Sequence, residues 1–328
     1  MSSSALSEAS AFRPARTRPA RIAVLVPCYN EALTIGPVVD AFRTALPGAD
    51  IHVFDNNSRD DTAAIARAHG ATVSKVTRRG KGNVIRRMFA DVEADIYVLV
   101  DGDDTYDASA APRLVEMLVA EALDLVNGAR KEQAQAAYRP GHRFGNVLLS
   151  GIVQIIFGRQ ITDMLSGYKV FSRRFVKSFP AMSRGFEIET ELTVHALELR
   201  MPMAETETPY KERPEGSHSK LSTVRDGARI FRLIARLVRD ERPLLFYSGL
   251  GVTLMAIGVI LAIPLLLTFF ETGLVPRVPT AILSTGLVLL GFLSVYAGVI
   301  LEMITKLRQE TKCLSYLTIP SPGELRLD

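Results

Sequence analysis

The stretch that decides the fold is Asp95-Ile-Tyr-Val-Leu-Val-Asp-Gly-Asp-Asp-Thr-Tyr-Asp107. It opens on an uninterrupted apolar run, residues 96–100, which is typical of a strand buried on both faces inside a parallel sheet. Four carboxylates follow the run at once, at Asp101, Asp103, Asp104 and Asp107. Because open α/β sheets bind ligands at the carboxyl ends of their strands, we expect these acids to line a binding site.

Carboxylates crowded this closely repel one another unless a cation lies among them. Oxygen ligands suit Mg²⁺ or Mn²⁺, which keep some waters and also bind a substrate phosphate. Asp101 and Asp103 are therefore candidates for a site that holds a metal ion and a nucleotide. The alternative is an acidic turn that caps the next helix, which Asp107 and Ser109 before Pro112 can provide. A short acidic motif alone does not decide between the two.

Strands and helices alternate on both sides of this stretch. Besides 96–100, strands are expected at 22–26, 51–54, 71–76 and 123–127, and helices at 34–46, 61–69, 80–92 and 110–121. The alternation predicts a doubly wound, mostly parallel α/β sheet. Asp55, like Asp101, directly follows a strand, so both are expected to face one crevice.

Glycine-rich phosphate-binding signatures are missing from the first strand–helix connection. Pro27-Cys-Tyr-Asn-Glu31 contains no glycine, and no P-loop sequence occurs elsewhere. A dinucleotide-binding dehydrogenase is therefore excluded, and nucleotide binding must use acids and a metal. The two cysteines, Cys28 and Cys313, lie far apart and suggest neither a disulfide framework nor a zinc site.

The composition is rich in apolar residues and has an excess of basic residues. The 328 residues are 48% apolar and carry a formal net charge of +4, and the mean hydropathy of +0.16 is high for a purely soluble protein. A basic excess favours nucleic acid, a membrane surface or phosphorylated ligands. Residues 1–20 lack the apolar core of a secretory signal and are expected to form a disordered basic tail.

The apolar excess is concentrated near the C-terminus. Residues 221–243 place apolar side chains opposite arginines at helical spacing, as in a helix that lies on a membrane surface or, alternatively, on nucleic acid. Leu244 to Phe270 is 27 residues without a charge, and Ala281 to Leu301 gives 21 more, each long enough to span a bilayer. These spans favour the membrane over nucleic acid, with a two-helix hairpin at 244–304.

Basic residues set the expected orientation of this hairpin. They crowd before the first span and follow the second at Lys306, Arg308 and Lys312, whereas the loop 271–280 has only Arg277. The positive-inside rule therefore predicts that the α/β domain, both termini and a tail at 305–328 are cytoplasmic and that the loop 271–280 lies outside.

A second acidic cluster, Gly185-Phe-Glu-Ile-Glu-Thr-Glu191, begins a helix. Acids in a first turn suit the helix dipole, which explains Glu187, Glu189 and Glu191 without any chemistry. A functional role for them is the alternative.

Six short motifs occur in one order along the chain. They are Pro27-x-Tyr29-Asn30-Glu31, Asp55-Asn-Asn-Ser58, Gly80-Lys81-Gly82, Asp101-Gly-Asp103, Asp163-x-x-Ser166-Gly167-Tyr168-Lys169 and Arg213…Gly216…Ser219-Lys220. With the two spans they resemble family 2 glycosyltransferases of the polyprenyl-phosphate type, similar to dolichyl-phosphate mannose synthase and to bacterial homologues with a C-terminal membrane hairpin. The resemblance covers about residues 22–310.

The resemblance implies a GT-A fold for residues 21–220, a nucleotide-sugar donor and a divalent cation. The residues implied in donor binding are Pro27, Tyr29, Glu31, Asp55, Lys81, Asp101, Gly102, Asp103, Arg213 and Lys220. Asp103 is implied as the ligand of Mg²⁺ or Mn²⁺, with Thr105 at the position where many relatives carry glutamine. The residues implied in catalysis are Asp101, Asp103, Arg130 and Lys220, and those implied at the acceptor phosphate are Arg139, Arg143, Ser166 and Lys169.

The implied reaction moves one hexose from a UDP- or GDP-sugar to polyprenyl phosphate, with inversion. A phosphate monoester is mostly dianionic at neutral pH, so such a nucleophile needs no strong general base. This agrees with three histidines, His52, His69 and His195, that lie within strand or helix patterns and are expected to be structural. Homo-oligomers are compatible with this interpretation.

Two alternatives stay open at this point. One is a membrane transferase with a hydroxyl acceptor, which needs a catalytic base; the chain has no tryptophan for the chain-holding motif of processive enzymes. The other is a non-catalytic membrane scaffold that keeps a nucleotide-binding fold, against which the intact Asp55, Asp101 and Asp103 count.

Overall fold

The structure is a computed structural model that describes residues 18–132, 151, 161–185, 187–211, 235–236 and 238–327. The chain forms two compact units, Met1–Thr223 with Lys312–Asp328 and Val224–Thr311. Each unit is described by itself. The juxtamembrane helix expected at 221–243 and the tail expected at 1–20 lie largely outside the described residues.

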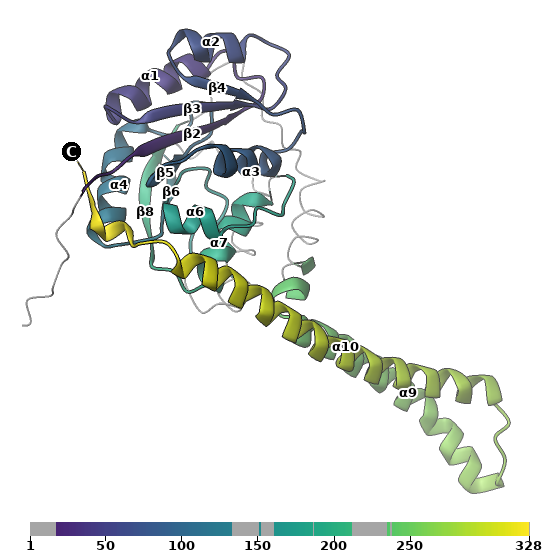
Figure 1. The fold of residues 1–328 in the computed structure, drawn as a ribbon. Coiled ribbons are helices and arrows are strands. Elements are labelled where there is room, and N and C mark those ends of the chain that lie inside the picture. The colour runs from purple at the N-terminus through teal and green to yellow at the C-terminus, as the bar shows by residue number, and fades with distance from the viewer. Residues whose placement is uncertain are drawn as a thin grey trace, which may run out of the picture. The chain divides into compact units, whose positions relative to one another are not determined.

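A seven-stranded sheet forms the centre of the first unit (Figure 1). Its strands in spatial order are β4 (Thr72–Lys75), β3 (Asp50–Asp55), β2 (Ile22–Cys28), β5 (Ile96–Leu99), β7 (Lys169–Ser172), β6 (Leu125–Glu132) and β8 (Met203–Tyr210). All neighbours are parallel except β7, which runs antiparallel to β5 and to β6. The predicted mostly parallel sheet is confirmed, and β7 is an addition that the alternation of elements did not predict.

Helices cover both faces of the sheet. They are α1 (Ile35–Ala45), α2 (Thr62–Ala68), α3 (Lys81–Asp91), the short 3₁₀ helix η1 (Ala108–Ala110), α4 (Ala111–Ala120), α6 (Arg173–Ser178) and α7 (Ile188–Glu198). Alternate residues of one strand enter opposite layers, because side chains of a strand point to opposite faces. Val98 of β5 packs with α1 and α4, whereas Tyr97 and Leu99 pack with α3, α6 and α7. This explains why β5 is apolar at every position.

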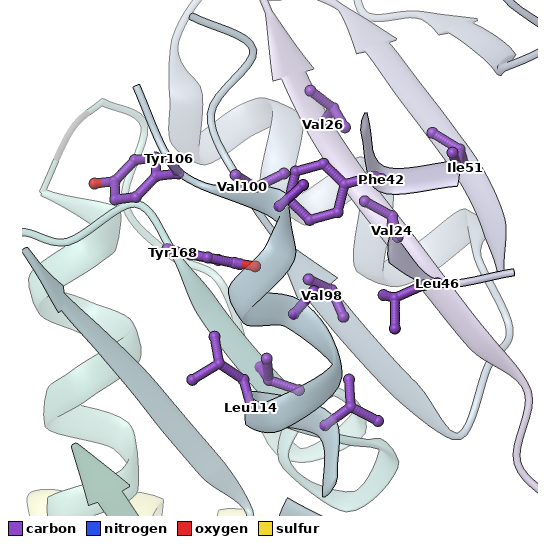
Figure 2. Packing of buried hydrophobic residues seen from close by; sticks show 14 of the residues in the cluster. Val24, Val26, Phe42, Leu46, Ile51, Val98, Val100, Tyr106, Leu114 and Tyr168 are labelled. Carbon is purple, nitrogen blue, oxygen red and sulfur yellow. The ribbon is translucent and has the colours of Figure 1, made fainter. Parts of the chain in front are cut away.

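The core on the α1–α4 side contacts the end of the acidic loop after β5 and the segment that precedes β7 (Figure 2). Phe42 of α1 contacts Tyr168 edge to face, with ring centroids 6.0 Å apart. Tyr168 in turn contacts Tyr106 at 5.5 Å. Because Tyr106 ends the acidic loop and Tyr168 precedes β7, both segments are anchored to one apolar layer.

The C-terminal segment also belongs to the first unit, although residues 305–328 were expected to be a tail. The two-residue strand β9 (Leu325–Arg326), which follows the 3₁₀ helix η2 (Pro322–Glu324), pairs in parallel with β1 (Arg18–Pro19). The Tyr316 hydroxyl donates to the fully buried Asp124 carboxylate at 2.8 Å, and the Lys312 ammonium lies 2.6 Å from Glu198. Residues 312–327 are thus packed structure.

The second unit is a helical hairpin of α9 (Pro243–Thr272) and α10 (Val278–Leu317) (Figure 1); the last residues of α10, from Lys312, belong to the first unit. Both helices are long and apolar enough to cross a membrane, as expected. The buried positions of α10 are small residues seven apart: Ser284, Gly291, Gly298 and Thr305. A Cβ at Gly291 would lie 2.7 Å from the carbonyl oxygen of Gly251 in α9, so the small residues let the two backbones approach closely.

Candidate active site

The acidic loop that follows β5 is held tightly against the end of β2. A Cβ at Gly102 would lie 2.6 Å from the sulfur of Cys28, so only glycine allows this approach. The Thr34 hydroxyl at the start of α1 donates to the Gly102 carbonyl at 2.6 Å. The backbone between Asp101 and Asp103 is therefore fixed by its neighbours on both sides.

Asp103 and Thr105 form one buried unit within this loop. Their exposed fractions are 5% and 1%, and the Thr105 hydroxyl donates to Asp103 Oδ1 at 2.6 Å. In the part of the chain that the structure describes, no group of three His, Cys, Asp or Glu residues is placed to hold a metal. Mg²⁺ and Mn²⁺ in nucleotide sites commonly use one or two carboxylates, with phosphate and water oxygens completing the shell. Asp103 fits that role, and Thr105 orients its carboxylate.

Lys81 bridges two carboxylates beside the loop. Its ammonium lies 2.5 Å from Asp101 Oδ1 and 2.6 Å from Glu189 Oε1, and its side chain is 8% exposed. Burial opposes the charge of Lys81, but the two carboxylates outweigh it and raise the pKa, so the ammonium stays protonated. Burial raises the pKa of Glu189, and the charge of Lys81 opposes this effect. The Lys81 ammonium thus joins the acidic loop after β5 to α7.

Gly167 brings the Asp163–Lys169 motif against the same aspartate. A Cβ on Gly167 would lie 2.3 Å from Asp101 Oδ2. The Gly167 amide donates to the Tyr106 hydroxyl at 2.7 Å. The segment expected at the acceptor phosphate and the acid expected at the donor are therefore in direct contact.

The residues expected to contact base and ribose lie on neighbouring loops. Pro27 belongs to β2, Tyr29 and Glu31 follow it, and Asp55 ends the adjacent strand β3. The amides of Asn30 and Glu31 donate to the hydroxyls of Ser58 and Thr62, both at 2.9 Å, so the loops after β2 and β3 are tied together. The Asp55 carboxylate is 4% exposed and accepts from the Ser58 amide at 3.1 Å.

Arg130 lies near the end of β6, which extends beyond the predicted strand at 123–127 because it pairs with β8 over eight residues. Its guanidinium donates to both oxygens of Asp163, from Nε at 2.7 Å and from Nη2 at 2.8 Å. Burial of Asp163 opposes its charge, but Arg130 outweighs this and lowers the pKa of the carboxyl. The guanidinium also lies 5.6 Å from the ring centroid of Tyr210.

A link through β8 connects Arg130 to the acidic loop. Tyr210 contacts Tyr106 with centroids 5.2 Å apart, and the Lys211 amide donates to the Thr105 carbonyl at 2.8 Å. The charges of Arg130 and Asp101 both act on Tyr106, whose pKa burial raises strongly. Arg130, Lys81 and the acids of the loop thus belong to one site.

Two residues expected at the acceptor phosphate are buried. Ser166 is fully buried and donates its hydroxyl to the Gly128 carbonyl at 2.5 Å. Lys169 is also fully buried, and its ammonium donates to Asn127 Oδ1 at 2.5 Å. Burial lowers the pKa of Lys169 to about 8. Neither side chain reaches the surface. The other cations proposed for phosphates lie outside the described residues: Arg139, Arg143, Arg213 and Lys220.

Sequence reasoning did not predict the contacts of three polar residues that the structure places at or beneath the site. Glu189 had a sufficient local explanation in the helix dipole, so its contact with Lys81 was not predicted. Asn127 and Glu205 lie on different strands, and only their register brings them together. The one available signal was Asn127, a polar residue that directly follows the apolar pair Leu125 and Val126 in β6; β8 is polar at several positions, so Glu205 gave no signal.

Comparison with known proteins agrees with this geometry. Residues 23–179 match the family Glycosyl transferase family 2. Glycosyltransferase AglJ of Haloferax volcanii is 32% identical over 298 residues, which are 89% of this chain and 96% of that protein. The dolichyl-phosphate hexose transferase of the same organism is 25% identical over 221 residues, which are 67% of this chain and 95% of that one.

Solved structures show the same fold. Glucosyl-3-phosphoglycerate synthase from Mycobacterium tuberculosis, in complex with Mn²⁺, uridine diphosphate and phosphoglyceric acid, has a TM-score of 0.55 at 26% identity. The match covers 67% of this chain and 78% of that one. The fold is thus that of GT-A glycosyltransferases, and two further helices are able to span a membrane. From the similarity to AglJ along nearly its whole length and the family match at residues 23–179, this chain belongs to glycosyl transferase family 2.

Proposed function

We propose that this glycosyltransferase moves a single hexose from a UDP- or GDP-sugar to polyprenyl phosphate at the cytoplasmic face of a membrane. The observation that carries the proposal is the direct contact between Asp101 and the Gly167 backbone, which joins the donor loop to the motif that leads to the Arg130–Asp163 pair. This contact supports a single site that combines the acids proposed for the donor with Arg130, one of the cations proposed for phosphate. The name of the dolichyl-phosphate hexose transferase supports a lipid phosphate acceptor.

The donor half of the proposed site uses the loops after β2, β3 and β5. The Asp55 carboxylate accepts from the base or the ribose, and Asp103 holds the divalent cation on the diphosphate. When bound, that cation neutralises charge on the departing nucleoside diphosphate. Lys81, kept protonated by Asp101 and Glu189, contributes a fixed positive charge beside the same group.

The transfer itself is a single displacement at the anomeric carbon. A phosphate oxygen of the acceptor attacks from the face opposite the diphosphate and forms the new C–O bond. The old C–O bond breaks, and its electron pair leaves with the nucleoside diphosphate, so the configuration inverts. No proton has to be removed from a dianionic phosphate. Arg130 stabilises charge in the transition state from a position that Asp163 has already set.

The hairpin supports a location at the membrane. An acceptor with a long polyprenyl chain stays in the bilayer, so the enzyme that uses it must work at the bilayer surface. Lys306 and Arg308 follow the second span, whereas the connection 273–277 carries only Arg277. This asymmetry supports cytoplasmic termini. A cleavage site inserted at 273–277 should be cut only from outside the cell, and cutting by a cytoplasmic protease would overturn this orientation.

A hydroxyl acceptor is the second candidate, and Glu189 is the observation that favours it. A buried carboxylate with a raised pKa beside Asp101 has the character of a general base. The close contact with Lys81 favours a structural role for the carboxylate instead.

The experiment is a matched screen with purified full-length protein in detergent and Mg²⁺. Radiolabelled UDP- and GDP-sugars are each offered undecaprenyl phosphate, dolichyl phosphate or a lipid alcohol of equal length. We expect label in the phosphate lipids and none in the alcohol. Label in the alcohol alone would establish the second candidate, and label in no lipid with any donor would reject both.

A further inference from the structure

A row of polar side chains crosses the sheet beneath Arg130. Lys169 of β7, Asn127 of β6 and Glu205 of β8 are cross-strand partners in register. The Lys169 ammonium donates to Asn127 Oδ1 at 2.5 Å, and Asn127 Nδ2 donates to Glu205 Oε2 at 2.7 Å. Lys169 and Asn127 are both fully buried. Burying the charge of a lysine inside a sheet costs free energy unless the ammonium is paired and hydrogen-bonded.

The row holds the loop that carries Asp163. Asn127 Nδ2 also donates to the Asp163 carbonyl at 2.9 Å. Glu205 Oε1 accepts from the Thr162 amide at 2.9 Å and from the Thr162 hydroxyl at 2.5 Å. Both backbone and side chain at 162–163 are thereby tied to the row.

Asp163, held by the row, in turn fixes the position of Arg130. Its carboxylate accepts from the backbone amide of Arg130 at 3.2 Å as well as from the guanidinium. A bidentate pair fixes the plane of a guanidinium and not only its distance. The plane determines which phosphate oxygens the remaining N–H groups can reach.

We propose that Lys169, Asn127 and Glu205 form a positioning row, which sets the place of the Arg130 guanidinium for a phosphate group of the substrate. Lys169 then acts through Asn127 and Asp163 and does not touch the phosphate that it was expected to bind. The kinetic part of this inference rests on the proposed function; the binding part described below does not.

The test compares Lys169→Met and Glu205→Gln with the control Glu207→Gln. Glu207 lies on β8 two residues beyond Glu205, and its ion pair with Lys131 is solvent-exposed, with side chains 67% and 69% exposed. Met has the length of the lysine stem without its charge. Gln has the shape of Glu205 but replaces one of its two acceptor oxygens by a donor. We expect both row variants to lose about tenfold to a hundredfold in kcat/KM, because misplacement of a binding group by about 1 Å costs up to about a hundredfold. The control should change less than twofold.

A double-mutant cycle separates positioning from direct contact. In an Arg130→Lys background the bidentate pair is already lost, so Lys169→Met should cost less than twofold there. An equally large loss in both backgrounds would mean that Lys169 acts independently of Arg130, and would overturn the proposal. Melting temperatures of all variants, measured in the same detergent, identify any loss that comes from unfolding. If Lys169→Met does not fold, the same double-mutant cycle is measured with Glu205→Gln and Arg130→Lys.

Binding of inorganic pyrophosphate with Mg²⁺, measured by calorimetry on the full chain, requires no sugar transfer. The Kd should rise in both row variants by about the factor seen in kcat/KM, and stay at the wild-type value in Glu207→Gln. Wild-type protein that binds no pyrophosphate, or row variants that bind it as well as wild type, would overturn the proposal. If the Kd for pyrophosphate rises in the row variants as expected but no lipid is labelled in the transfer screen, the proposed function would be rejected and the proposal of a positioning row would stand.

Discussion

Replacing Gly167 by alanine tests whether the contact between Asp101 and the Asp163–Lys169 motif matters for transfer. The new Cβ would lie 2.3 Å from Asp101 Oδ2 and 2.8 Å from its Cγ, whereas ordinary contacts start at 3.4 Å. The carboxylate or the backbone must therefore move by about 1.1 Å, the difference between 3.4 and 2.3 Å. Asp101 cannot turn away freely, because its other oxygen is held by Lys81 at 2.5 Å.

A shift of about 1 Å in a group that orients the reacting atoms lowers the rate by about a hundredfold. We therefore expect Gly167→Ala to lose roughly two orders of magnitude in kcat/KM, measured as sugar transferred to polyprenyl phosphate by the detergent-purified enzyme. Insertion of one methyl group into a packed site destabilises a protein by about 1–3 kcal/mol, so the variant should still fold. The backbone of Gly167 does not need glycine, since its φ is not in the left-handed region.

Gly286→Ala is the matched control, because a Cβ there meets no atom within 4 Å. It should leave kcat/KM and the melting temperature unchanged. A Gly167→Ala enzyme with wild-type kcat/KM would show that the position of Asp101 does not limit the reaction. A loss of activity that simply follows a collapse in melting temperature would equally refute the reasoning.

Four more outcomes are expected. Glu189→Gln should lower kcat/KM less than about tenfold if the acceptor is a phosphate, whereas loss of a general base costs about 10²–10⁴-fold. Tyr316→Phe removes one hydrogen bond to the buried Asp124 carboxylate and should destabilise the protein by about 1.5–3 kcal/mol in thermal unfolding, with kcat unchanged. Gly291→Leu should loosen the hairpin and speed its proteolysis in detergent, because the facing backbone leaves no room for a side chain. Burial lowers the pKa of His195 from 6.5 to about 3, so the unfolded chain binds a proton that the folded chain does not; stability should fall as the pH drops from about 6.5 towards 3, and less steeply in His195→Gln.

The parts of the fold that could be predicted are those with local causes. Buried parallel strands are rich in apolar residues, so β2, β3 and β5 stand out, and the acids Asp55 and Asp101 at or just after the ends of β3 and β5 mark the crevice. The strand β7 has four residues and exists because β5 and β6 both pair with it. No local pattern reveals such pairing. The small-residue spacing in α10 likewise acquires meaning only when the facing helix is known.

Residues of the candidate site could be anticipated from the sequence where their type and position are typical of one kind of ligand. Aspartates at the end of a strand favour a site for a metal and a nucleotide. An acid in the first turn of a helix has a structural explanation in the helix dipole, so the contact of Glu189 with Lys81 was not predicted. The family resemblance implied that Lys169 binds the acceptor phosphate, and lysine is rarely buried. Its burial depends on the register of three strands, and that register is a property of the assembled sheet.

The packing of residues 312–327 makes the hairpin an insertion within the globular unit. Asp124 is translated 192 residues before its partner Tyr316, an interval of roughly 10–40 s at ordinary rates of synthesis. Both hydrophobic helices leave the ribosome during that interval. Insertion into the bilayer is therefore under way before the globular unit can close around Asp124. The order of synthesis makes membrane targeting an early step in the maturation of the enzyme, and a chain that stops before residue 312 would lack the segment that completes its globular unit.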